Sequence, residues 1–168
     1  MGKVLNQFTR GFKGEVTRAH DNVIISMKNV DTNPIAYGAP VFLKAANNGV
    51  QNFISGTTTE ATFVGFACRV ADKTPPSAGV SPSDTTQNTG HFEPGEPVDI
   101  LVRGSICVPC ASASAKPGDA LYIRKADSLL VNSAGTEGST VPVPNTTIRC
   151  ARDLNSQVEI VITKRNLI

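Results

Sequence analysis

Short apolar runs, separated by turn residues, follow one another along most of this chain. The strongest run is residues 98–108, where alternate positions place Val98, Ile100 and Val102 on one face of an extended strand. Residues 63–70 are almost wholly apolar, which indicates a strand buried on both faces or a close backbone approach at Gly65. No segment has the 3.6-residue period of a long helix, so the pattern predicts a β protein.

Weaker runs of the same kind predict the remaining strands, and a few residues mark where pairing is interrupted. Gly104 indicates a bulge or a bend within residues 98–108. Pro142 and Pro144 remove backbone donors, so no central strand is expected there. The other expected strands are residues 22–30, 41–44, 50–54, 120–124, 148–151 and 158–163.

A turn followed by a strand is repeated three times, at residues 37–43, 94–102 and 117–123. In the second and third copies, proline fixes φ and the following glycine accepts a positive φ, so each strand begins from a defined turn. The expected turn residues are Gly38, Pro94, Gly95, Pro117 and Gly118. This punctuation predicts a compact β framework.

The composition agrees with a single mainly β domain. A length of 168 residues suits one core, and 14 glycines with 11 prolines favour short strands and many loops. We expect a small β-barrel or β-sandwich, β-tulip-like in form, over residues 23–168. Residues 1–22 have no strong period and are predicted to form an extended N-terminal arm, while the polar residues 72–91 predict a long surface loop.

Charge is distributed unevenly along the chain, although the net charge is only +2. Residues 1–30 hold five basic and two acidic side chains, whereas residues 72–99 hold one basic and five acidic side chains. The arm is therefore a candidate contact for an acidic or polar partner. An equally good interpretation is that both segments are ordinary solvated surface.

Several classes of partner have little support in the composition. Seven Phe, two Tyr and no Trp are too few for a surface that stacks sugars or bases, so no nucleic acid partner is expected. No apolar run approaches the roughly 20 residues that span a bilayer, and the first residues lack the apolar region of a signal peptide. We expect no contact with a membrane, and we expect the protein to be made in a cytoplasm.

The cysteines and histidines are the candidate metal or redox ligands. Only Cys107 and Cys110 are closely spaced, whereas a zinc site with four thiolates needs two such pairs. That pair ends a strand-like run, unlike a redox Cys-x-x-Cys, which opens a helix. His20 and His91 belong to no metal-binding pattern. We expect the thiols to pack as small hydrophobes, with no metal and no cofactor.

Carboxylate pairs are the remaining candidates for catalysis. Asp99 with Asp119, or Glu93 with Glu96, could act as acid and base. Glu96 and Asp119, however, follow Pro-Gly in equivalent positions of the repeated turn, where an acid bonds its own backbone. No nucleophile elbow or phosphate-binding loop is present in the sequence. We therefore expect a protein that is not an enzyme.

Six segments occur in an order that matches a known family. They are residues 14–16, 23–26, 35–41, 64–67, 94–106 and 116–122. Together they resemble the head decoration, or structural cement, proteins of tailed bacteriophages, over roughly residues 14–125.

The resemblance implies a β-rich protein that binds the outer capsid surface of a virion at junctions between major capsid protein subunits and stabilises the shell. It also implies a homo-oligomer, a trimer ahead of a dimer. An arm suits binding across subunit boundaries, because an extended chain covers about 3.3 Å per residue. The hypothesised capsid-binding residues are Phe8, Arg10, Phe12, Lys13 and Arg18. The alternative function is another virion structural protein, a head fibre or tail component, that contacts the host surface through residues 72–91.

Overall fold

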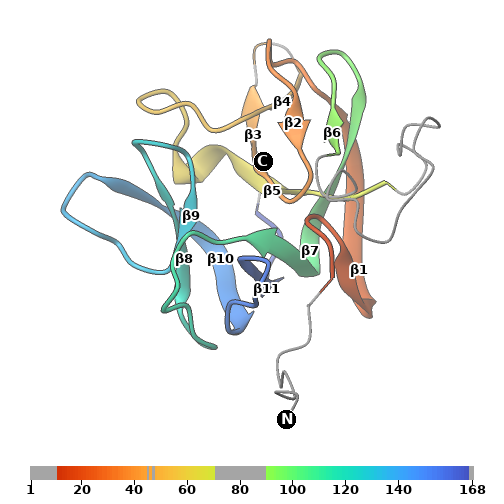
Figure 1. Ribbon diagram of the computed structural model, residues 1–168. Helices are drawn as coiled ribbons and strands as arrows, with labels where there is room; N and C mark the ends of the chain where they lie inside the picture. The colour runs from red at the N-terminus through yellow and green to blue at the C-terminus, as the bar shows by residue number, and fades with distance from the viewer. Residues whose placement is uncertain (1–10, 45, 47, 71–89, 167–168) are drawn as a thin grey trace.

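The computed structural model describes residues 11–44, 46, 48–70 and 90–166, without the side chains of residues 18–20. Most of the predicted 72–91 loop therefore lies outside the described residues. The described chain is built from strands and loops (Figure 1), and none of its segments is a helix that could cross a membrane. The elements are β1 (Val16–Lys28), β2 (Ile35–Ala36), β3 (Pro40–Lys44), β4 (Gly49–Gln51), the 3-10 turn η2 (Glu60–Thr62), β5 (Phe63–Ala67), β6 (His91–Phe92), β7 (Pro97–Pro109), β8 (Ala120–Arg124), β9 (Leu130–Val131), β10 (Thr140–Cys150) and β11 (Gln157–Ile162).

Nine strands form one large antiparallel sheet, and β2 pairs with β6 in a second, two-stranded sheet. The order in the large sheet is β4-β3-β5-β7-β11-β10-β8-β9, and β1 pairs with β7 outside this path. The path ends at β4 and β9, and no closed barrel is found within the described part of the chain. The mainly β class is thus confirmed, while the barrel alternative is not supported.

Strand β7 is paired along both of its edges. Its first half pairs with β5 around Leu101, and residues 104–109 pair with β11. Strand β1 pairs with residues 97–106 of β7, so it must lie along the opposite edge. Three segments from different parts of the chain, β1, β5 and β11, therefore meet on β7. Figure 1 shows β1 running beside β7.

The interruption expected at Gly104 lies where β7 changes partner from β5 to β11. The pairing with β1 shifts between Arg103 and Ser105, and Gly104 has a φ of +122°. A Cβ at this position would collide with the side-chain oxygen of Asn22 on β1. Only glycine suits this position, because a positive φ strains other residues and because there is no space for a methyl group.

The strands β3, β5 and β7 separate two hydrophobic cores. Phe63, Phe66 and Leu101 face one core, which the strands β8 to β11 complete. Val64 and Ile100 face the other core, which includes β2 and β6. Neighbouring residues of the same strands, such as Phe63 and Val64, are therefore buried on opposite sides, and all of β5 is buried.

Both expectations for residues 63–70 are met within β5. The strand is buried on both faces, and a Cβ on Gly65 would overlap the carbonyl oxygen of Leu101 on β7. This close approach allows the two strands to pack without a side chain between them.

Strand β1 is longer than the sequence predicts, because it begins at Val16 and not near residue 22. Residues 16–22, which the sequence places in the arm, lie in a strand with an irregular register on β7. The division of the chain into arm and domain otherwise stays a prediction.

Strand β10 is longer than the sequence predicts, because it runs through Pro142 and Pro144, although it is not a central strand there. Residues 140–142 pair only with β8, whereas residues 146–150 pair with β11. The proline stretch therefore pairs with one strand only. Its other edge has no partner among the described strands, so the missing N–H donors of the prolines cost no hydrogen bonds there.

A buried carboxylate fixes the chain just after β1. Asp31 accepts hydrogen bonds from N and Nδ2 of Asn52, both at 2.9 Å, and from the backbone N of Asn33. Burial raises the pKa of Asp31, but the hydrogen bonds from Asn52, Asn33 and Thr32 outweigh burial and lower the pKa below its usual value. The ionised carboxylate thus holds the loop after β4 against the end of β1.

Candidate functional site

The N-terminal segment enters the domain through a tight turn at residues 12–15. The N of Glu15 donates to the O of Phe12 over 3.0 Å, and the N of Phe12 donates to Oε2 of Glu15 over 2.7 Å. Gly14 has a φ of +75°, which is the conformation that this turn requires. The turn is therefore closed by its own backbone and by its own acid.

The same turn is packed into the body of the domain. Gly14 N donates to the O of Cys107 on β7 at 2.8 Å, and Arg69 N donates to the O of Gly14 at 2.7 Å. Cys107 N donates in turn to the O of Glu15 at 2.9 Å. A Cβ on Gly14 would lie 2.9 Å from three backbone atoms of neighbouring segments. Residues 12–15 are thus a fixed part of the domain, positioned by β7 and by the chain after β5.

Phe12, Lys13 and Arg69 form a patch at this turn, which we call the N-terminal patch. Phe12 is 39% exposed, although it is a large apolar side chain. The guanidinium carbon of Arg69 lies 4.1 Å from the centroid of the Phe12 ring, within the range of a cation–π interaction. Lys13 follows Phe12 in the turn and is half-buried. The patch thus presents an aromatic face with positive charge beside it.

The structure brings together only part of the predicted set of site residues. Phe12 and Lys13 lie in the turn at residues 12–15, and Arg18 lies in β1, where its backbone pairs with Ser105. Phe8 and Arg10 lie outside the described residues. Arg69 is missed by the sequence, because its contact with Phe12 joins residues far apart in the chain and no local pattern indicates it.

The acids of the repeated turn bond their own backbone. Glu93 N donates to Oε2 of Glu96 at 2.7 Å, and Lys116 N donates to Oδ2 of Asp119 at 2.9 Å. The glycines of these two turns have φ values of +89° and +92°. Hydrogen bonds from the Asn132 side chain and from the Lys116 backbone lower the pKa of Asp119. Both acids therefore have a structural role as turn residues.

The turn at residues 12–15 is a further copy of this arrangement that the sequence pattern does not show. Gly14-Glu15 corresponds to Gly95-Glu96, and each acid accepts a hydrogen bond from the backbone N three residues earlier. The signal is a glycine followed by an acid, but Lys13 stands where the other copies have proline. The Gly-acid pair marks all three of these turns in the sequence.

The remaining candidates for chemistry are held in structural roles. Burial, with a smaller contribution from Asp99, raises the pKa of Cys68 to about 12, and burial also raises the pKa of Cys110. Such thiols are protonated at neutral pH, whereas metal and redox sites use thiolates. Asp99 accepts a hydrogen bond from Ser26 on β1. Among the described residues, no group of His, Cys, Asp and Glu is arranged to hold a metal ion.

Comparisons with known proteins agree with this structural role. The model of the family described as structural cement protein (E217 gp24/Pam3 gp6) matches residues 2–163. Among solved structures, the chain is similar to one in the capsid of Myoviridae phage XM1, with a TM-score of 0.68 and 15% sequence identity. That match covers 97% of this chain and 96% of the other chain, and at this identity it shows a shared fold. No curated protein sequence matches.

The packing of the N-terminal turn can be tested with two glycine variants. Gly118→Ala adds a methyl group at a positive φ where no atom lies within 4 Å, so it should cost only the backbone strain of about 1–2 kcal/mol. Gly14→Ala adds similar strain and also a collision with the surrounding backbone, so it should cost at least about 1 kcal/mol more. Urea unfolding of both variants measures the difference. Equal losses of stability would show that residues 12–15 are not packed as described.

Proposed function

Because this chain belongs to the phage structural cement protein family, we propose that it binds the outside of the head at junctions between major capsid protein subunits. The family is structural and not enzymatic, and the chain is a cement protein of the phage capsid. Contact with capsid proteins follows from this membership. The junction as the binding position, and reinforcement of the shell there, belong to our proposal.

The family match favours this function over the alternative of a head fibre or tail component. That alternative depended on residues 72–91, most of which lie outside the described residues. The described sites give it no further support, because the exposed apolar and basic groups identified above lie at the N-terminal turn.

The N-terminal segment is the docking element in this proposal. Its contacts with the capsid would be made by Phe8, Arg10, Phe12, Lys13 and Arg18. The observation that supports it is the N-terminal patch, in which Phe12 and Lys13 lie on a turn fixed to β7 and the guanidinium of Arg69 lies over the Phe12 ring. Because the turn is already fixed, its side chains lose less entropy on binding than those of a loose segment would. Aromatic anchors and basic groups suit a surface that offers apolar pockets and carboxylates.

The docking role can be tested by deleting residues 2–10, which removes Phe8 and Arg10 but leaves the turn at residues 12–15 intact. We expect the apparent Kd for capsids that lack this protein to rise at least about tenfold, because apolar and charged anchors are lost. The melting temperature of the unbound protein should stay unchanged, since the turn and β1 remain. Co-sedimentation over a range of protein concentrations measures the Kd.

Two charge reversals provide a second test of the docking role and its matched control. Lys13→Glu changes the N-terminal patch, whereas Lys164→Glu changes an exposed lysine beyond the end of β11. The first should weaken capsid binding and the second should not. Unchanged binding by both the deletion and Lys13→Glu would contradict the docking role.

We further propose that the protein is a homo-oligomer, with a trimer ahead of a dimer, as the resemblance to cement proteins implies. Val23 and Ile24 on β1 are 39% and 47% exposed, and neighbouring apolar side chains of this kind suit burial between subunits. Light scattering of the purified protein should give three times the chain mass of 17.7 kDa. A mass of one chain at micromolar concentration would contradict the proposal.

A further inference from the structure

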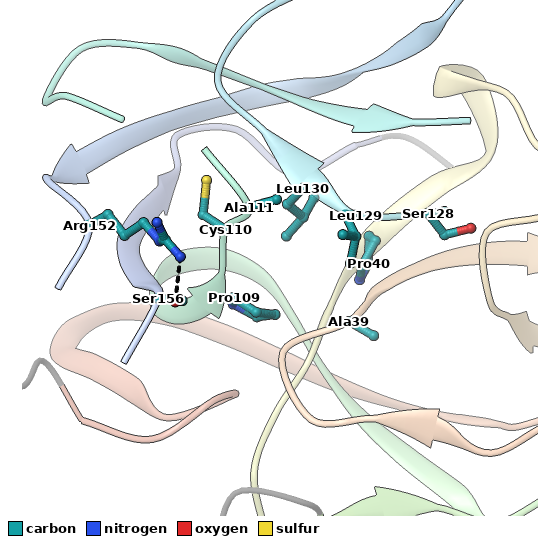
Figure 2. Close-up of a pocket in the computed structure, with 10 residues that line it drawn as sticks. All are labelled: Ala39, Pro40, Pro109, Cys110, Ala111, Ser128, Leu129, Leu130, Arg152 and Ser156. Carbon is teal, nitrogen blue, oxygen red and sulfur yellow. Dashed lines mark hydrogen bonds between the residues drawn. The ribbon is translucent and has the colours of Figure 1, made fainter. Parts of the chain in front are cut away.

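An apolar groove lies beside the end of β7, and none of the N-terminal patch residues lines it. Its walls include Pro40 at the start of β3, Pro109 at the end of β7, and Leu129 and Leu130 before and within β9. Arg152 and Ser156, from the loop between β10 and β11, form its polar end (Figure 2). The groove has a volume of about 270 Å³, which suits one or two side chains better than a cofactor.

The wall that carries Leu129 is preformed. Arg124 Nε donates to Oδ1 of Asp127 at 2.9 Å, and Leu129 N donates to the same carboxylate at 3.2 Å. Arg124 N also donates to the O of Leu129 at 2.9 Å. Leu129 is nevertheless 45% exposed, so a well-held segment keeps a large apolar side chain in solvent. A rigid, exposed apolar wall is typical of a surface that a partner covers.

One donor of Arg152, at the polar end of the groove, has no acceptor among the described residues. Arg152 donates from one terminal nitrogen to the hydroxyl of Ser156, but its Nε is buried without a hydrogen-bond partner among the described residues. Gln157, which follows Ser156, is completely buried, and both polar atoms of its side chain lack partners. Leaving a buried donor unpaired costs about 1–3 kcal/mol, so native proteins normally supply an acceptor.

No carboxylate of the described residues forms an ion pair with Arg152. The described ion pairs join His91 to Glu93, Arg103 to Asp21 and Arg124 to Asp127. The neighbouring acid, Asp153, accepts from the backbone N atoms of Asn155 and Gln157. The positive charge at the end of an apolar groove therefore complements an incoming carboxylate.

We infer that this groove binds an extended segment of the major capsid protein, with an aliphatic or proline side chain between the apolar walls and an acidic side chain on Arg152. The inference rests on the proposed function, since it takes a capsid protein as the partner. It adds a second contact that is distinct from the N-terminal patch. Two contacts on one rigid domain bind more tightly together than either alone, because the second binding event becomes intramolecular.

Two variants test the groove against two matched controls. Leu129→Asp puts a charge on the apolar wall, and Ile54→Asp makes the same change at a side chain that is 41% exposed and does not line the groove. Arg152→Gln removes the cation, and Arg149→Gln removes another arginine that donates to a serine hydroxyl, that of Ser105. The probe is a capsid assembled from the major capsid protein alone, with binding measured by co-sedimentation.

We expect Leu129→Asp and Arg152→Gln each to raise the Kd about tenfold. The Kd of each control variant should stay within about twofold of that of the parent protein. Leu129 is exposed, so its variant should fold even if Arg152→Gln does not, and thermal melting checks this. If Leu129→Asp binds with the Kd of the parent protein, the inference that the groove binds the capsid is wrong, but the proposed function still stands. A parent protein that does not bind these capsids would instead overturn the proposed function. A change in oligomeric mass caused by Leu129→Asp would identify a second copy as the occupant, which overturns the inference of a capsid segment.

Discussion

The pairing of β7 along both edges is the constraint on which the rest of the structure depends. One strand joins β1, β5 and β11, and through them both hydrophobic cores. This arrangement requires β5 to approach β7 so closely that only glycine fits at position 65. It also requires a local irregularity at Gly104, where the partner on one edge changes from β5 to β11. A fault in β7 would therefore loosen every part of the sheet at once.

The same strand positions the surfaces that we assign to capsid binding. The backbone of Cys107 holds the turn at residues 12–15, and that turn orients Phe12 and Lys13 beside Arg69. The end of β7 supplies Pro109 to the wall of the apolar groove. One continuous strand therefore supports both of these surfaces. The turn acids and the buried carboxylate support this framework, and the thiols of Cys68 and Cys110 pack within the first core.

Local signals in the sequence predict much of the framework. The apolar runs of β5 and β7 and the Pro-Gly turns are visible because each depends on a few adjacent residues. The start of β1 cannot be predicted in this way, because residues 16–22 are mostly polar and are held through backbone pairing to β7. Strand β10 is missed at Pro142 because single-edge pairing, which tolerates proline, is a tertiary property. The contact of Phe12 with Arg69 and the groove at Arg152 likewise depend on which strands become neighbours, and no local pattern records that.

Hydrogen–deuterium exchange of the free and the capsid-bound protein tests most directly the claim that β7 anchors a fixed capsid-binding surface. The amides of residues 98–108 should exchange most slowly in both states, because most of these residues are buried and β7 is paired along both edges. New protection on binding should appear at residues 11–15 and around Leu129. Fast exchange in β7 of the free protein, or new protection confined to residues 133–140, would contradict this claim.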